Sequence, residues 1–108
     1  MKNLPTVITD LIEAQNNANS SAYANCFSEM AVVVDEGKTY NGRKEIEHWI
    51  AAANEQYKTV MKPLNYNEKG NTKVLSAEVS GSFPGSPVVL NYHMEIIDNL
   101  IQSLKTTT

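Results

Sequence analysis

The stretch that most constrains the fold of this chain is residues 31–50, AVVVDEGKTYNGRKEIEHWI. Its first residues form an apolar run that ends in Asp35, and this run predicts a short β-strand. After a polar turn, Asn41 and Gly42 introduce a helix in which apolar residues recur at helical spacing, at Ile46, Trp49, Ile50, Ala53 and Tyr57. The stretch therefore predicts a strand and an amphipathic helix, with one carboxylate where the strand ends.

Two further helices are predicted before this stretch. Pro5 suits the first turn of a helix, because its missing N–H needs no partner there. One face of this helix carries Ile8, Leu11, Ile12 and Gln15, and the helix ends near Ala18. Ser20 or Ser21 then caps a short helix that places Tyr23, Cys26 and Phe27 on one side.

The residues after Tyr57 alternate between apolar and polar positions, which predicts strands. We expect strands at residues 31–35, 38–40, 58–67, 72–83, 88–98 and 100–104, with turns at 69–71, 84–87 and 98–99 and a frayed end at 106–108. Pro63 has no N–H to donate to a neighbouring strand, so its strand lies at an edge of the sheet or carries a bulge.

Helices in the first half and strands in the second predict one α+β domain over residues 1–108. The three helices pack on the concave face of a mostly antiparallel sheet, which Pro63 and Gly81 bend. A helix layer on a curved sheet leaves a cone-shaped hollow, and such a hollow is suited to binding a small molecule.

Composition argues against several kinds of partner and cofactor. The formal net charge is −3 and the basic pair Arg43-Lys44 is followed by Glu45, so we expect no nucleic-acid partner. No apolar run reaches the roughly 20 residues of a membrane helix, and the N-terminus turns acidic too early for a secretory signal. The single cysteine, Cys26, excludes an intrachain disulfide and fits a cytoplasmic protein.

Asp35 is the first candidate for chemistry. A carboxylate at the mouth of an apolar hollow is suited to act as a general base. The alternative is a structural carboxylate that accepts hydrogen bonds from backbone N–H groups of the turn that follows the strand. The two histidines, His48 and His93, fall on different elements, so we expect no metal site and no cofactor.

The order of these motifs resembles one known family. A helical hairpin ending in Phe27, the strand at 31–35, Tyr40-Asn41-Gly42 and the closing stretch at 94–101 look like the SnoaL-like proteins. These proteins belong to the cone-shaped superfamily of nuclear transport factor 2, the polyketide cyclases and ketosteroid isomerase. The resemblance extends over nearly the whole chain and implies the cone fold.

The resemblance also implies roles for individual residues. Ketosteroid isomerase carries its general base after a Phe-x-x-x-Ala pattern, which residues 27–31 match, so Asp35 falls on the base. The donor on the isomerase's first helix matches Leu11, which cannot donate, so steroid isomerisation itself is not expected. The second donor matches Tyr92 by strand alternation or His93 by an ungapped match. Alternation favours Tyr92. The alternative to a role as donor is that Tyr92 is a structural aromatic residue of the core.

Together these features predict a protein with a pocket for a small, mostly apolar molecule with a polar head. The expected lining is Tyr23, Phe27, Val33, Tyr40, Trp49, Tyr57, Phe83 and Met94. The family implies a homodimer formed through the sheet. An enzyme of this kind would work by cofactor-free proton transfer next to a carbonyl, with Asp35 as base and Tyr92 as donor. The rival hypothesis is a non-catalytic binding or interaction module, in which Trp49, Tyr57 and Phe83 close the space around Asp35.

Overall fold

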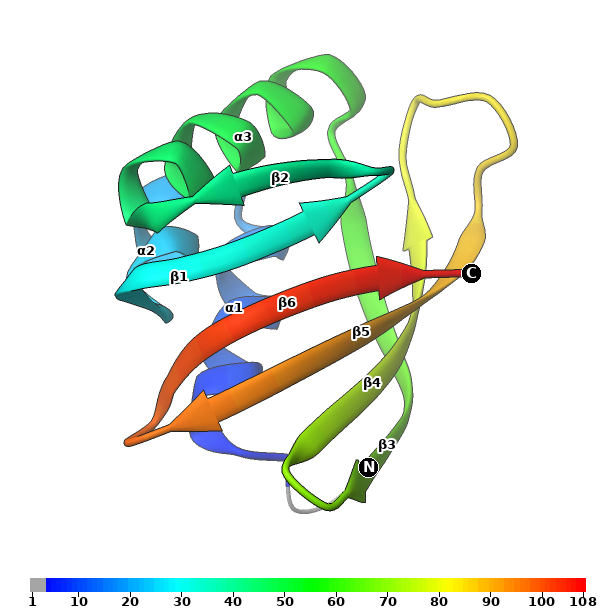
Figure 1. Cartoon of the computed structure of the whole chain (residues 1–108). Coiled ribbons are helices and arrows are strands. Elements are labelled where there is room, and N and C mark those ends of the chain that lie inside the picture. Colours follow the sequence, from blue (N-terminus) through cyan, green and yellow to red (C-terminus); the bar gives the residue numbers. More distant parts are fainter. Residues whose placement is uncertain (1–3) are drawn as a thin grey trace.

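Residues 4–108, which the computed structural model describes, form three helices and six strands. In chain order these are α1 (Thr6–Asn16), α2 (Ser20–Ala24), β1 (Phe27–Asp35), β2 (Lys38–Asn41), α3 (Gly42–Tyr57), β3 (Val60–Lys69), β4 (Thr72–Ser80), β5 (Val88–Ile97) and β6 (Leu100–Thr107). The strands make one sheet in the order β2-β1-β6-β5-β4-β3, in which β1 and β6 are parallel and the other neighbours are antiparallel. The sheet curves around the helices on its concave face (Figure 1), so the predicted α+β cone is confirmed.

The first strand begins at Phe27, so the prediction of a helix through Phe27 is wrong. The short helix α2 ends at Ala24, and its N-cap is Asn19 rather than a serine. Phe27 pairs with Ile101 of β6, and its carbonyl accepts hydrogen bonds of 3.1 and 2.6 Å from the Arg43 side chain at the start of α3. These long-range partners override the local helical spacing.

The last strand extends to Thr107, so the predicted strand end at Leu104 and the frayed terminus are also wrong. β6 lies inside the sheet, where it pairs with β1 on one side and with β5 on the other. Thr106 is the cross-strand partner of Tyr92 on β5. A strand held on both sides is not free to fray, and this pairing brings Thr106 to the candidate site.

Both expected consequences of Pro63 are confirmed. Its strand, β3, is an edge strand, and the register of its pairing with β4 shifts between Pro63 and Asn65. The extra residue exchanges the two faces of the strand, so that Met61 packs against the core before the bulge and Tyr66 after it. The strict alternation predicted for residues 58–67 is therefore wrong beyond Pro63.

One hydrophobic cluster lies between the helices and the sheet. Its largest fully buried side chains are Tyr23, Phe27, Ile8, Leu11, Ile46, Leu75, Met94, Ile101, Leu104 and Val33. They come from all three helices and from β1, β4, β5 and β6, so a single core joins both layers. Within residues 4–108, no helix is long and apolar enough to cross a membrane.

Candidate functional site

Asp35 closes β1 at the end of the sheet from which the β4–β5 loop projects (Figure 1). Ala31 and Val33 share its face of the strand and are fully buried, whereas Asp35 itself is half-buried. Its Oδ1 accepts a hydrogen bond of 2.5 Å from Oγ1 of Thr106 on β6. The carboxylate therefore lies at the rim of the apolar interior, with one oxygen fixed by a hydroxyl.

The two candidates on β5 lie on opposite faces of the sheet. Tyr92 is 7% exposed and belongs to the core cluster on the inner face. His93 lies on the outer face, where its Nε2 is 2.9 Å from Oγ1 of Thr107. Tyr92 is thus the residue that shares the interior with Asp35, and both are joined to Thr106, one by strand pairing and the other by a hydrogen bond.

Tyr23 enters the same interior from the helix layer. It is 2% exposed, and its ring lies 5.7 Å from that of Phe27 and 6.2 Å from that of Trp49 between centroids. Burial raises the pKa of Tyr23 well above its ordinary value of 10.0, and negative charge at Tyr92 and Asp35 raises it further. Burial, and then Asp35, likewise raise the pKa of Tyr92. Both hydroxyls therefore stay protonated and lie within electrostatic reach of the carboxylate.

The other side chains expected to line a pocket fall into two groups. Three are fully buried in the core, namely Phe27, Val33 and Met94. The others form aromatic pairs at the edge of the core, where Tyr40 stacks on Trp49 at 5.4 Å and Tyr57 meets Phe83 edge-on at 6.0 Å. The second pair lies where the β4–β5 loop reaches the end of α3.

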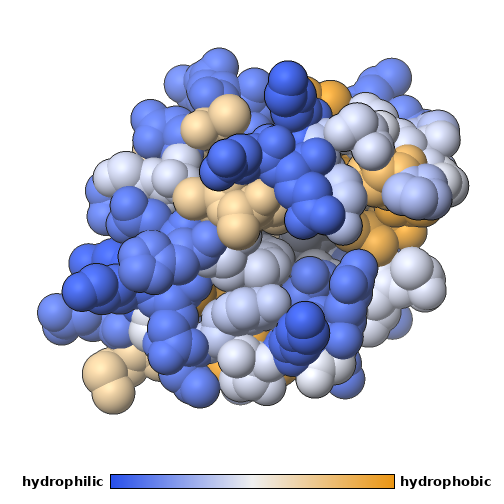
Figure 2. All heavy atoms as spheres, turned by 90° about the horizontal axis from the view of Figure 1, so that it is seen from above, coloured by the Kyte–Doolittle hydropathy of each residue, from blue (hydrophilic) through white to orange (hydrophobic). Residues whose placement is uncertain are grey.

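The β4–β5 loop is fastened to the end of α3. The backbone N–H of Ser82 donates to the carbonyl oxygen of Tyr57 at 2.8 Å. A Cβ at Gly81 would lie 2.6 Å from the same oxygen, so this approach needs glycine. In the view from above (Figure 2) most of the surface is hydrophilic, and hydrophobic atoms gather at the right-hand edge, the end that carries this loop.

A second buried polar cluster joins the ends of α1 and α3. The amide Nε2 of Gln15 donates to Oδ1 of Asn54 at 2.9 Å and to the carbonyl oxygen and Oγ1 of Thr59 at 3.0 and 2.7 Å. Beside it, the Asn16 amide pairs with the backbone N–H and C=O of Met61 at 2.8 and 3.0 Å. The sequence placed Gln15 on the core face and missed Asn54, although Asn54 follows Ile50 by one helical turn.

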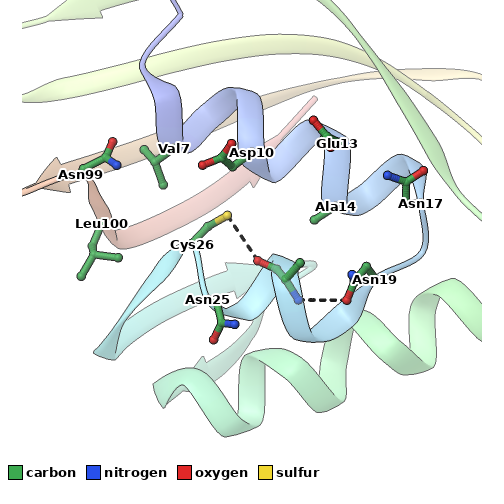
Figure 3. Close-up of a pocket in the computed structure, with 11 residues that line it drawn as sticks. Val7, Asp10, Glu13, Ala14, Asn17, Asn19, Asn25, Cys26, Asn99 and Leu100 are labelled. Carbon is green, nitrogen blue, oxygen red and sulfur yellow. Dashed lines mark hydrogen bonds between the residues drawn. The ribbon is translucent and has the colours of Figure 1, made fainter.

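One hollow in the described part of the chain lies outside the cone (Figure 3). It has a volume of about 420 Å³ and lies between α1, α2 and the β5–β6 turn, where Asp10 and Glu13 are joined by four asparagines. Its floor includes Cys26, whose thiol donates to the Ala22 carbonyl at 3.5 Å. Burial, and then Asp10, raise the pKa of Cys26 to about 11, which suppresses the nucleophilic thiolate.

A smaller hollow, of about 240 Å³, lies on the outer face of the sheet and is bordered by Val32, His93 and Lys105 among others. Of the expected site residues, Met94 alone borders either hollow; Asp35 and Tyr92 border neither. Within residues 4–108, no group of three His, Cys, Asp or Glu side chains is arranged to hold a metal ion.

Three solved structures show what the chain is similar to. A protein from Sinorhizobium meliloti, provisionally named a polyketide cyclase, is 35% identical, with 96% of this chain and 95% of that chain covered and a TM-score of 0.91. A hypothetical protein from Catenulispora acidiphila with a ketosteroid isomerase-like fold, solved in complex with trimethylamine, is 19% identical over 98% and 87% of the two chains, with a TM-score of 0.87. An NTF2-like protein of unknown function from Cytophaga hutchinsonii is 17% identical over 99% and 93%, with a TM-score of 0.78. The comparisons with protein-family models and with curated protein sequences gave no match.

The helices on a curved six-stranded sheet, with an acid at the rim, define a cone-fold protein of the nuclear transport factor 2 class. The 35% identity over almost the full length of both chains identifies the family within this class. The chain belongs to the SnoaL-like family of polyketide cyclase relatives within that superfamily. The matches below 25% identity show the fold alone.

Proposed function

We propose that this protein binds a small, mostly apolar molecule whose polar head lies against Asp35 inside the cone. The observation that carries the proposal is the position of Asp35, a carboxylate at the rim of an apolar interior, held by Thr106 and close to Tyr92. A carboxylate in this position is suited to accept a proton from a ligand. The neighbouring tyrosine hydroxyl is suited to donate a hydrogen bond to the oxygen on which charge develops.

The proposed reaction is a proton transfer next to a carbonyl group, without a cofactor. Asp35 takes a proton from the carbon beside the carbonyl, and the electron pair left behind moves onto the carbonyl oxygen, which becomes an enolate. Tyr92 donates its hydrogen bond to that oxygen. The provisional name of the Sinorhizobium relative agrees with a ligand that carries carbonyl groups.

Hydrogen–deuterium exchange tests this reaction without knowledge of the natural substrate. The probe is 2-tetralone in D₂O, an apolar bicyclic ketone whose exchange beside the carbonyl is followed by NMR. Asp35→Asn should slow the protein-dependent exchange by about 100-fold or more, the usual contribution of a general base. Asp98→Asn removes a carboxylate from the exposed β5–β6 turn and should leave the rate unchanged. Equal exchange rates for the wild type and Asp35→Asn would remove the role of base.

A non-catalytic ligand-binding module of the same fold is the second candidate. It is favoured by the hollows of about 420 and 240 Å³, which lie outside the cone, and by the aromatic pairs that pack around the interior. This candidate predicts that 2-tetralone binds, as measured by calorimetry, while its exchange rate stays at the rate in buffer.

We also propose a homodimer formed through the outer face of the sheet, in a cytoplasmic protein. Val89 and Ile97 on this face are 48% and 60% exposed, and a hollow on the same face is bordered by His93 and Lys105. Exposed apolar side chains next to charged ones are typical of an interface between subunits. Ile97→Glu should shift the sedimentation coefficient from dimer to monomer, and a wild type that sediments as a monomer contradicts the dimer. The lone buried thiol of Cys26 agrees with a reducing compartment.

A further inference from the structure

Two tyrosine hydroxyls inside the cone have no hydrogen-bond partner among residues 4–108. Tyr23 on α2 is 2% exposed and Tyr92 on β5 is 7% exposed. By contrast, the hydroxyl of Tyr66, near the end of β3, donates to Glu68 at 2.8 Å. Buried polar groups of native proteins nearly always have partners, because a lost hydrogen bond in the interior costs about 1–3 kcal/mol.

Within the described residues, the fully enclosed side-chain atom that lacks a partner is Nδ2 of Asn54, and neither tyrosine oxygen is enclosed to that degree. A donor that lies deep in the fold, has no partner there and is not completely covered is available to an acceptor from outside the chain.

The two hydroxyls and the carboxylate lie at different depths in the fold. Asp35 is half-buried at the rim, Tyr92 lies next to it through Thr106, and Tyr23 is the most deeply buried of the three. Tyr23 comes from the helix layer and Tyr92 from the sheet, so their side chains reach the interior from opposite layers. The charge of Asp35 acts on both tyrosines.

We propose that Tyr23 is a ligand-binding residue whose hydroxyl donates, together with that of Tyr92, to one neutral carbonyl oxygen of the ligand. The proposal rests on the proposed ligand-binding function and narrows its substrate class. Two neutral donors suit an uncharged carbonyl, and the charge of Asp35 disfavours a carboxylate head group at the same place. The pair also makes Tyr23 the second donor for the oxygen of an enolate.

A matched pair of probes tests this assignment. 2-Tetralone and tetralin have the same ring system and differ in one carbonyl group, so the ratio of their dissociation constants in calorimetry reports the contacts of the carbonyl oxygen. The wild type should prefer 2-tetralone, and Tyr23→Phe should weaken 2-tetralone binding by about five- to tenfold, the value of one neutral hydrogen bond. Tetralin binding should not change.

Tyr66→Phe is the matched control, because Tyr66 is not among the expected site residues and its hydroxyl donates to Glu68 near the end of β3. It should keep the preference for the ketone. If Tyr23→Phe keeps the preference too, the role of Tyr23 is overturned while the proposed function stands. If the wild type shows no preference, or binds neither probe up to its solubility, both proposals are contradicted.

A second measurement avoids any loss of folding in the variant. The protein has five tyrosines, and labelling their ring Cζ with ¹³C gives one signal for each hydroxyl-bearing carbon. 2-Tetralone should shift the signals of Tyr23 and Tyr92, assigned from the Tyr→Phe variants, and tetralin should shift neither hydroxyl signal comparably. A ketone shift confined to Tyr92 overturns the assignment of Tyr23.

Discussion

The two buried polar clusters of this protein differ in what their groups bind. At the ends of α1 and α3, the side chain of Gln15 finds acceptors on Asn54 and Thr59, which lie 39 and 44 residues away in the sequence. Inside the cone, the hydroxyls of Tyr23 and Tyr92 find no acceptor among residues 4–108, although they are buried as deeply. The Gln15 amide is thus held within the fold, although Nδ2 of Asn54 beside it has no partner among the described residues, whereas the two tyrosine hydroxyls are the donors that we propose for a ligand.

This difference separates polar residues that hold the fold from polar residues that serve a site. A hydrogen bond between distant segments stabilises the native state, and losing one of its partners leaves the other buried and unpaired. A buried hydroxyl without a partner contributes no such bond, so its removal should cost little stability and should affect binding instead. Four measurements test the contrast.

The largest effect is expected for Gln15→Leu, which removes all the hydrogen bonds of the Gln15 amide. We expect the free energy of unfolding to fall by about 2–3 kcal/mol, because the polar atoms of Asn54 and Thr59 lose a buried donor. Urea denaturation followed by the fluorescence of Trp49 gives this value. Gln56→Leu, on the exposed side of α3, is the control and should stay within about 0.5 kcal/mol of the wild type. A similarly small loss for Gln15→Leu would show that the amide cluster does not hold the helices together.

The next effect is a loss of stability at alkaline pH. The pKa values of Tyr23 and Tyr92 are raised in the folded state. The folded state therefore keeps its full stability below the ordinary pKa of 10.0 and loses stability as the pH rises above it, because the unfolded chain releases these protons first. Each such group lowers the free energy of unfolding by up to about 1.4 kcal/mol per pH unit in that range. The double variant Tyr23→Phe/Tyr92→Phe should therefore lose less stability than the wild type between pH 9 and 11. Parallel curves would contradict the burial of these hydroxyls.

Thr106→Val should have a smaller effect, of about 1 kcal/mol, because it removes the hydrogen bond to a half-buried carboxylate. The same substitution should also slow the exchange of 2-tetralone without raising its dissociation constant, because Asp35 keeps its charge but loses its fixed orientation. Thr107→Val on the outer face is the control and should leave the exchange rate unchanged. An unchanged rate in Thr106→Val would mean that Thr106 does not position Asp35.

The sequence predicted those parts of the fold and the site that depend on neighbouring residues. Strand alternation put Asp35 on one side of its strand with Ala31 and Val33 and favoured Tyr92 over His93 for the inner face, and helical spacing placed Gln15 on the core face. It could not predict that Thr106 holds Asp35, because the two residues are 71 positions apart and the pairing of β1 with β6 is not a local property of the sequence.

The start of β1 and the amide cluster were missed for the same reason. Phe27 has helical spacing to Tyr23, and only its pairing with β6 makes it a strand residue. In the sequence, Asn54 is one polar residue near the end of a helix. Its hydrogen bond exists only because α1 packs beside that helix. Periodicity thus determines which way a side chain points, whereas the partner it meets depends on the tertiary fold.

The smallest expected effects on stability come from removing the buried tyrosine hydroxyls, and they test the contrast between the Gln15 cluster and these hydroxyls most directly. Tyr92→Phe and Tyr23→Phe should each change the free energy of unfolding at pH 7 by less than about 0.5 kcal/mol, because the lost hydroxyl has no partner among residues 4–108. Tyr66→Phe loses its bond to Glu68, an exposed contact, and serves as a control of similarly small cost. A loss above about 1 kcal/mol for either buried tyrosine would mean that its hydroxyl is satisfied within the fold. In that case the tyrosines would belong with Gln15 and Asn54, and the interior of the cone would be core rather than site.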